Sequence, residues 1–488
     1  MDISDLTKQN PWWKNPNEIE KDRYIREYEN AEYPWEPRLR HLFEFDGDFV
    51  YTLRGPRQVG KTTLVKLFIR KKLEKGVEPE RIFYYTCDIL EDSEKLNELL
   101  EIYLEWSRDL TENRLYIFLD EISSVKNWQD TVKLLKDTGR LENATLVLTG
   151  SHSQDIKESG EMLPGRRKPS AQQTSDVTVN KILVPMKFAE FLEIQRDPLP
   201  PLKKLDQRKR AVLGLYEGEV PKWIQLAKPY LSDLNKLFEQ YLITGGFPAT
   251  VSQYLSEGSI DPSLYELYTR FVIGDICKWG KKENYLRSIS AKLIDTISTK
   301  VGWDTIRKDT PINHHDTVKE YVKALKDSFI LNIVHKCDPN KKRRLDRSHK
   351  KIYFTDPHIL HSIKTWVEGV SDPFRETKAC LEDPEFKSKV VETVVCDHLI
   401  RLTYNLQSSD TFDSENFLFY WHNSKEVDFL FKHGGKLWPI EVGYREEIGS
   451  KGKWIRKRFG TPLIISKNTL EIEDEYAIIP ASMFLSMI

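Results

Sequence analysis

Residues 55–62 read GPRQVGKT, and this stretch decides the fold. It fits the phosphate-loop pattern GxxxxGK[ST], and it lies between a strand-like run, FVYTLR, and a helix expected to begin near Lys61. Gly55 and Gly60 allow the backbone to curl so that successive N–H groups face a phosphate, and the helix N-terminus adds its dipole. Lys61 can then reach the β- and γ-phosphates of a nucleotide, and the Thr62 hydroxyl can bind Mg²⁺.

A phosphate loop needs an acidic partner at the end of a hydrophobic strand, and LYIFLDE supplies Asp120 and Glu121. Asp120 would hold Mg²⁺ through water, and Glu121 would orient and polarise the attacking water. We predict ATP rather than GTP hydrolysis, because GTPases recruit a glutamine for the second task. The next strand, TLVLT, would place Thr149 or Ser151 beside Asp120 and the γ-phosphate. The expected nucleotide-binding residues are therefore Gly55, Pro56, Arg57, Gln58, Val59, Gly60, Lys61, Thr62, Thr63, Asp120 and Ser151.

A second candidate for the nucleotide site is the loop LPGRRKPS, which presents Arg166 and Arg167 between glycine and proline. One interpretation is an arginine finger that acts within the chain or on a neighbouring subunit, and the other is a solvated charge pair. Because a finger that acts on a neighbouring subunit requires an oligomer, a homo-oligomer is one possible state of the protein.

Composition sets the broad class of protein. A chain of 488 residues predicts two to four domains, and its 74 basic and 75 acidic residues nearly cancel, so any electrostatic footprint must be local. The five cysteines are far apart and contain no CxxC, which argues against a disulfide framework and a zinc knuckle. The N-terminus has no apolar signal region, and the longest apolar run is short. We expect a cytoplasmic protein without membrane contact.

The chain divides into five predicted parts. An N-terminal arm (1–45) precedes a P-loop ATPase core (46–195), where strand-like and helical runs alternate as in a parallel α/β sheet. A helical lid or linker (196–282), a winged helix (283–356) and a small mixed α/β domain (357–488) follow. The winged helix is predicted from apolar positions at helical spacing in 318–329, followed by a polar loop and the strand-like KIYFTD.

A basic patch lies in the loop of this predicted winged helix. Residues 336–351 contain eight basic and two acidic side chains, a local excess of six in a chain without net charge. On the wing, beside Lys319 and Lys323 of the preceding helix, the patch would meet the phosphates of duplex DNA, although such loops are often only solvated. The DNA-binding candidates are Lys319, Lys323, Lys341, Lys342, Arg343, Arg344 and Arg347.

The order of RQVGKTT, DEISSVKNWQDTVKLLKDTG, LVLTGSHS, LPGRR, VPMKFAEFL and ITGGFPA, followed by VVETVV, WHNSKEVDFLF and LWPIEV, resembles the archaeal-type AAA+/STAND-related ATPases. The resemblance spans nearly the whole chain after the arm. It implies a P-loop core, a helical lid, a winged helix and a C-terminal domain like that of PD-(D/E)XK nucleases.

In a PD-(D/E)XK site an aspartate and a glutamate on adjacent strands hold Mg²⁺, and a lysine two residues after the glutamate positions the hydroxide. Asp428 and Glu441 have this spacing, with Glu392 on the preceding helix as an auxiliary acid, but the lysine position is Gly443. Lys451 or Lys453 could supply the amine. A live nuclease, a metal or DNA site without cleavage, and an inherited structural pair all stay open, and the missing lysine favours the site without cleavage.

We therefore predict a Mg²⁺-dependent ATP-binding and ATP-hydrolysing protein that acts on, or is regulated by, DNA. The alternatives are a STAND-type signalling or scaffold switch without DNA contact, and an ATP-controlled nuclease. DNA-stimulated ATPase activity would distinguish the protein that acts on DNA from the signalling or scaffold switch. Digestion of plasmid or branched DNA would test the ATP-controlled nuclease.

Overall fold

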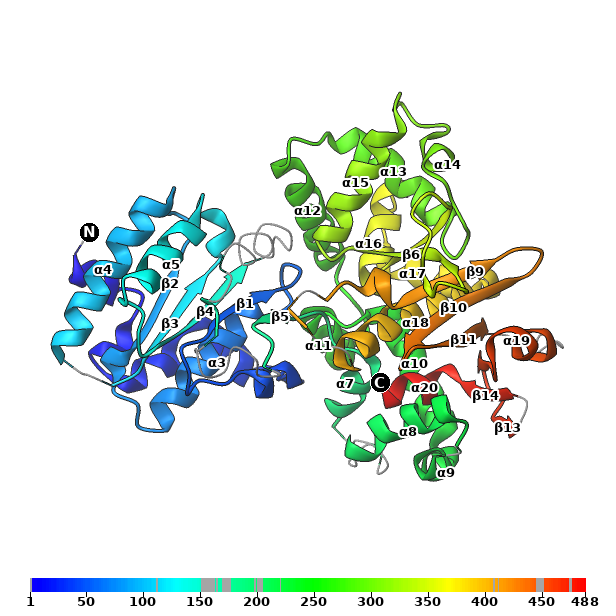
Figure 1. Ribbon diagram of the computed structural model, residues 1–488, viewed down its shortest axis with the longest axis horizontal. Coiled ribbons are helices and arrows are strands. Elements are labelled where there is room, and N and C mark those ends of the chain that lie inside the picture. Colours follow the sequence, from blue (N-terminus) through cyan, green and yellow to red (C-terminus); the bar gives the residue numbers. More distant parts are fainter. Residues whose placement is uncertain are drawn as a thin grey trace. The chain divides into compact units, whose positions relative to one another are not determined.

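The computed structural model describes residues 2–110, 113–150, 163, 166–168, 177–196, 199, 205–219, 221–406, 409–410, 412–444, 452–473 and 476–488. The chain forms two compact units, Met1–Val184 and Pro185–Ile488, which Figure 1 shows in blue to cyan and in green to red. Among the described residues, no helix is both long enough and apolar enough to cross a membrane.

The first unit is built on a five-stranded parallel sheet in the order β2-β3-β4-β1-β5. Its strands are β1 (Val50–Arg54), β2 (Ile82–Thr86), β3 (Leu115–Asp120), β4 (Ala144–Gly150) and β5 (Asn180–Ile182). Its helices are α1 (Ile3–Thr7), α2 (Arg23–Glu29), α3 (Lys61–Glu74), α4 (Ser93–Leu110) and α5 (Trp128–Asp137). Short 3₁₀ segments lie at η1 (Pro11–Trp13), η2 (Pro16–Lys21), η3 (Arg38–Leu42), η4 (Pro79–Arg81) and η5 (Ile122–Ser124). The predicted α/β class and P-loop core are confirmed, although the strand predicted at ILVPM ends at Ile182.

Apolar side chains cover both faces of this sheet, as buried parallel strands require. Residues of α1, α4 and α5 form one core cluster with alternate residues of β2, β3 and β4. On the other face, Phe68 of α3 packs edge-on against Phe45, which lies against Phe118 of β3. Packing thus covers the two faces of the sheet, and the ends of its strands are the places where a ligand could bind.

The N-terminal arm caps the edge strand β2. Asn10 accepts a hydrogen bond from the backbone N–H of Tyr84 at 2.7 Å and donates one to its carbonyl at 3.0 Å, as a neighbouring strand would. The indoles of Trp12 and Trp13 both donate to the carbonyl of Ile82, at 3.0 and 2.9 Å. Since a bare sheet edge is a template for aggregation, the arm protects the fold by occupying it.

The helices of the second unit are α7 (Phe188–Glu193), α8 (Leu205–Glu217), α9 (Lys222–Ala227), α10 (Leu231–Thr244), α11 (Pro248–Glu257), α12 (Pro262–Lys278), α13 (Glu283–Asp295), α14 (Trp303–Arg307), α15 (His315–Asp327), α16 (Pro357–Glu368), α17 (Pro373–Glu382), α18 (Pro384–Leu406), α19 (Gly452–Phe459) and α20 (Ala481–Met487). Its strands are β6 (Leu331–Asp338), β7 (Arg343–Arg344), β8 (Lys350–Phe354), β9 (Leu418–His422), β10 (Glu426–His433), β11 (Lys436–Gly443), β12 (Leu463–Ser466), β13 (Glu471–Glu473) and β14 (Tyr476–Pro480). Among the described residues of this unit, 3₁₀ turns lie at η8 (Lys228–Tyr230) and η9 (Ser414–Asn416).

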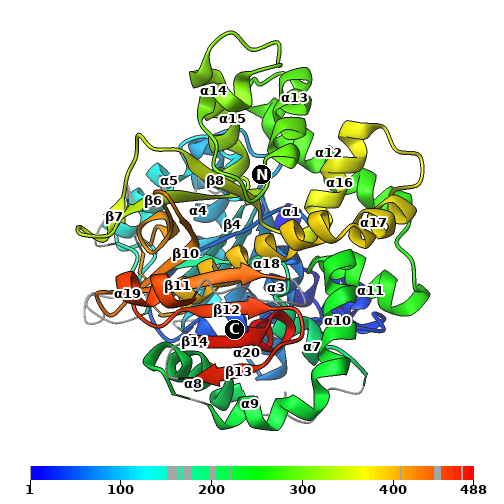
Figure 2. The ribbon, with the colours of Figure 1, turned by 90° about the vertical axis from the view of Figure 1, so that its right-hand side faces the viewer.

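These strands form one nine-stranded mixed sheet in the order β13-β14-β12-β11-β10-β9-β6-β7, with β8 also paired to β6 (Figure 2). Helices α13, α14 and α15 precede the hairpin of β6 and β8, and Val301 bridges Lys350. The hairpin joins the C-terminal strands because β6 pairs in parallel with β9. The boundary predicted near residue 356 therefore does not coincide with a break between compact units.

Candidate functional site

The phosphate loop connects β1 to α3, and Lys61 is the first residue of the helix. The Lys61 side chain is buried, and its ammonium group donates to the carbonyls of Gly55 and Pro56, each at 2.9 Å. A Cβ atom on Gly55 would lie 1.9 Å from the carbonyl oxygen of Leu183, and Gly60 has a left-handed φ of 98°. Both glycines are therefore required by the backbone.

Asp120 is the centre of the hydrogen bonding beside this loop. The Thr62 hydroxyl donates to its Oδ2 at 2.7 Å, and the Tyr84 hydroxyl donates to the same oxygen at 3.1 Å. Thr149 donates to Oδ1 and also accepts the backbone N–H of Glu121 at 3.1 Å. Side chains from the middle of β2 and from near the end of β4 thus converge on the carboxylate that ends β3, beside the phosphate loop and at the end of the sheet where parallel sheets bind ligands.

Several predicted residues are placed by this arrangement. The structure brings Thr62, Asp120 and Thr149 together, whereas Ser151 lies outside the described residues. Glu121 directly follows β3 in a left-handed conformation with φ of 53°, which is uncommon for a residue other than glycine. Sequence reasoning missed Tyr84, whose pKa is raised by burial and by the neighbouring Asp120. Only the neighbouring position of β2 and β3 in the sheet identifies it.

The contacts of Arg167 contradict the prediction that it is an arginine finger. Its guanidinium is buried and donates to the Thr52 hydroxyl at 2.9 Å, the Asn180 amide oxygen at 2.8 Å and the Val50 carbonyl at 3.2 Å. It therefore ties β1 to β5. Val50 begins β1, whereas the phosphate loop follows its last residue, so Arg167 lies at the opposite edge of the sheet.

Arg166, the other candidate finger, forms a two-pronged ion pair at the surface. Its Nε and Nη2 atoms lie 2.6 and 3.0 Å from the two carboxylate oxygens of Asp137, the last residue of α5. Asp137 precedes β4, so this pair also lies near the beginnings of the strands. Within the described residues, neither arginine is placed beside the phosphate loop.

The segment that leaves the first unit is held firmly on both sides of Val184. Before it, the backbone N–H of Leu183 donates to the carbonyl of Arg54 at 2.8 Å, directly before the phosphate loop. After it, Met186 N–H donates to the carbonyl of Gly246 at 2.8 Å, within the predicted ITGGFPA turn. The chain is thus hydrogen-bonded to the first unit directly before Val184 and to the second unit directly after Pro185.

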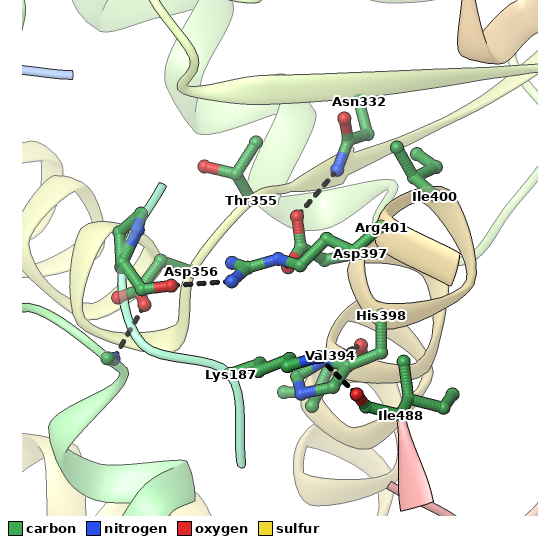
Figure 3. A network of polar contacts seen from close by, with 12 residues as sticks. Lys187, Asn332, Thr355, Asp356, Val394, Asp397, His398, Ile400, Arg401 and Ile488 are labelled. Atoms are coloured by element: carbon green, nitrogen blue, oxygen red, sulfur yellow. Dashed lines mark hydrogen bonds and ion pairs between the residues drawn. The ribbon is translucent and has the colours of Figure 1, made fainter. Parts of the chain in front are cut away.

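Figure 3 shows the polar network around the start of the second unit. His398 accepts the backbone N–H of Phe188 at 2.9 Å and contacts the carbonyl of Val394 at 2.8 Å. Arg401 pairs with Asp397 at 2.5 Å, and its Nη1 atom donates to the carbonyl of Pro185 (Figure 3). Burial raises the pKa of Asp356 to about 7, although the Gly246 and His358 N–H groups oppose the rise.

A second cluster lies in the Pro185–Ile488 unit, around Lys351 of β8. The Lys351 ammonium is 3.0 Å from Oδ1 of Asp428, 3.3 Å from Oε1 of Glu392 and 2.6 Å from Oε1 of Glu426. The side chain of Lys351 is 1% exposed. Sequence reasoning looked for a lysine near Gly443 and in the helix after it, whereas the structure supplies one from a strand far earlier in the chain.

Backbone contacts fix the carboxylates of this cluster. Glu441 accepts the Asp428 N–H at 3.3 Å, and Asp428 accepts the Val442 N–H at 3.1 Å, so the two acids lock β10 to β11. The Tyr353 hydroxyl donates to Glu392 at 2.6 Å. The predicted trio of Glu392, Asp428 and Glu441 is therefore brought to one place.

The charges of this cluster depend on one another. Burial opposes the charge of Lys351, but Asp428, Glu392 and Glu426 more than offset it and raise its pKa well above the ordinary value. Burial raises the pKa of Glu392 to about 7, partly opposed by Lys351. Among the described residues, no three histidine, cysteine or acidic side chains are placed to hold a metal ion together.

The predicted basic patch is only partly available to a partner. Arg344 pairs with Glu415 at 2.6 Å and with Asp346 at 2.8 Å, which removes it from the expected DNA face. Lys350 is buried with its ammonium 3.9 Å from the centre of the Trp303 ring, and burial lowers its pKa to about 8. The candidates that remain exposed are Lys319, Lys323, Lys341, Lys342, Arg343 and Arg347.

Comparison with known families agrees with this geometry. Residues 48–192 match the AAA domain family. Together with the parallel sheet, this match identifies the first unit as a P-loop ATPase fold. Residues 235–369 and 387–480 match two families described as domains of unknown function, DUF8612 and DUF4143.

Relatives extend over most of the chain. An uncharacterized protein of Haemophilus influenzae is 22% identical over 419 residues, covering 83% of this chain and 85% of that protein. An uncharacterized protein of Methanocaldococcus jannaschii is 22% identical over 422 residues, covering 83% of this chain and 77% of the relative. Among solved structures, the Aeropyrum pernix Orc1 protein in complex with DNA is similar with a TM-score of 0.29 and 12% identity, covering 75% of this chain and 98% of that one.

Proposed function

We propose that the chain binds ATP with Mg²⁺ and hydrolyses it, and that DNA is the partner whose binding this cycle controls. The observation that carries the ATPase part is Asp120, which gathers the hydroxyls of Thr62, Tyr84 and Thr149 directly in front of the phosphate loop. Gly55 to Gly60 would surround the phosphates with backbone N–H groups.

Thr62 and Asp120 fit a Mg²⁺ site, since a hydroxyl and a carboxylate oxygen only 2.7 Å apart are the hard oxygen donors this ion takes. When bound, the ion would neutralise charge on the β- and γ-phosphates. Lys61 would exchange its bonds to the loop carbonyls for phosphate oxygens. Glu121 would accept a proton from the attacking water, and Thr149 would hold the Glu121 backbone in place.

The test uses two variants with different expected outcomes. Lys61→Ala should abolish binding of a fluorescent ATP analogue, because it removes the ammonium group that would bind the β- and γ-phosphates. Glu121→Gln should bind ATP normally but retain it unhydrolysed, and steady hydrolysis by this variant would remove Glu121 from its role.

The proposal that DNA is the partner rests on the exposed basic side chains of the Pro185–Ile488 unit. Among the described contacts, no acidic neighbour neutralises the charge of Lys319 or Lys323. ATPase turnover measured with and without single-stranded, duplex and branched DNA tests it. Stimulation supports a protein that acts on DNA, whereas indifference favours the nucleotide-dependent switch.

A second candidate function, metal-dependent phosphodiester cleavage, is favoured by Lys351. Its ammonium contacts Asp428 and Glu392, which is the place from which a protonated lysine could position a hydroxide in a PD-(D/E)XK-like site. Digestion of plasmid and branched DNA with Mg²⁺ or Mn²⁺ should then be lost in both Lys351→Met and Glu441→Gln. Absence of cleavage by the wild-type chain would leave the cluster with a structural role.

A further inference from the structure

A groove of about 580 Å³ opens in the second unit, away from the Lys351 cluster. Its size falls within the range of pockets that bind small ligands, roughly 300 to 1,000 Å³. Three segments form its walls: the β6–β7 turn, the start of β11, and the end of α19 with the turn that follows. The end of α8 closes it. Figure 2 shows β7, α19 and β11 on the same side of the second unit.

Positive charge dominates the lining of this groove. Its charged members are Lys342, Lys436, Arg458 and one acid, Glu217. All three cations are exposed, and each comes from a different wall. Lys342 also donates to the carbonyl of Gly435 at 2.5 Å, so the β6–β7 turn is fixed against the β10–β11 turn.

Aromatic rings line the same groove. Tyr216 meets Trp438 edge-on with ring centres 5.4 Å apart, and its hydroxyl donates to the carbonyl of His433 at 2.6 Å. Phe459 also lies in the wall, half-buried, beside the guanidinium of Arg458 at 5.7 Å from the ring centre. Rings held by packing lose little conformational freedom when a base stacks on them.

We propose that this groove binds single-stranded nucleic acid, with phosphates on Lys342, Lys436 and Arg458 and a base against the aromatic wall. The proposal rests on the DNA-acting function proposed above and gives that function a specific site and strand preference. Alternating cationic and aromatic side chains are the chemistry that binds unpaired nucleotides without reading their sequence. A duplex keeps its bases stacked inside and would offer this groove its phosphates alone.

The experiment measures binding of fluorescein-labelled oligo(dT) by fluorescence anisotropy, using the full chain at several salt concentrations. Lys436→Glu/Arg458→Glu should weaken binding at least tenfold and lower the salt slope by about 1.4, since each single-strand phosphate contact contributes about 0.7. Arg375→Glu/Lys378→Glu on α17 replaces one arginine and one lysine outside the groove and is the matched control, expected to stay within twofold. Both pairs are exposed, so folding should be preserved.

The outcomes separate the site from the function. Equal weakening in both variants would overturn the groove, because charge alone would then explain binding. Displacement of the oligonucleotide by dTMP at similar concentration would also overturn it, since the groove would be a small-ligand site. If the wild-type chain binds no DNA, both the groove and the proposed function are refuted. If DNA stimulates the ATPase but the groove variant binds oligo(dT) as well as wild type does, only the groove is refuted.

Ultraviolet crosslinking of bromodeoxyuridine oligonucleotides gives an independent reading. Crosslinked peptides should contain Tyr216, Trp438 or Phe459, and Phe459→Leu should lower the yield while keeping an apolar side chain against Trp421. Crosslinks confined to peptides outside the groove would contradict the proposal.

Discussion

Replacing Lys351 with methionine keeps most of the side-chain volume but removes the cation from a buried acidic cluster. Three carboxylates lie within hydrogen-bonding range, from Asp428, Glu392 and Glu426. Glu426 is 34% exposed and can be hydrated, so it contributes little. Asp428 and Glu392 are only 16% and 12% exposed, so water screens their charges much less. Breaking a buried pair costs about 3–5 kcal/mol, and we expect that loss at pH 8.

The loss should shrink in acid, because Glu392 can then be neutral. Its pKa is already raised to about 7 with Lys351 present, and removing the cation raises it further. A carboxyl group whose folded pKa is raised destabilises the native state progressively as pH rises from its unfolded to its folded pKa, and the effect is complete above the folded pKa. The deficit of Lys351→Met relative to wild type therefore grows only above about pH 7, so between pH 8 and pH 6 it should fall by about 1 kcal/mol, at about 1.4 kcal/mol per pH unit.

The assay is urea unfolding of the full chain, followed by hydrogen-exchange mass spectrometry of peptides from β8, β10 and α18, which report on this unit directly. Lys425→Met, at an exposed position nearby, is the control and should change stability by less than about 0.5 kcal/mol. Mn²⁺ should stabilise Lys351→Met more than wild type, because it can replace the lost charge. An unchanged free energy of unfolding at both pH values would refute the reasoning.

Three further predictions concern other parts of the molecule. Asn10→Ala should destabilise the first unit by about 1–3 kcal/mol and promote aggregation in light scattering, since both backbone groups of Tyr84 lose their partner. Arg167→Met should cost about 1–3 kcal/mol, because neutral buried acceptors lose their donor, yet leave ATPase turnover per folded molecule unchanged, whereas a fall in turnover would restore the arginine-finger role. Burial lowers the pKa of His361 to about 4, so the native state loses stability as pH falls below about 6.5. His361 contributes about 2 kcal/mol of this loss at pH 5, so His361→Gln, which can keep the bond to Leu242, should lose about 2 kcal/mol less than wild type between pH 7 and pH 5 in denaturant titrations.

The sequence by itself determined the P-loop core. A phosphate loop, the strand ending at Asp120 and the alternation of strand and helix are local patterns, because each depends on residues a few positions apart. The same locality allowed Asp428 and Glu441 to be paired, since they lie on neighbouring strands of one hairpin. Their partner Lys351 could not be found this way.

Only the tertiary structure decided which distant segments meet. Lys351 reaches Asp428 because β8 pairs with β6, and β6 pairs with β9. Arg167 is a structural residue because β5 returns beside β1, and Tyr84 reaches Asp120 because β2 is the neighbour of β3. Hydrophobic periodicity fixes which face of a strand is buried, but it does not specify the neighbouring strand. That choice follows from packing over the whole unit.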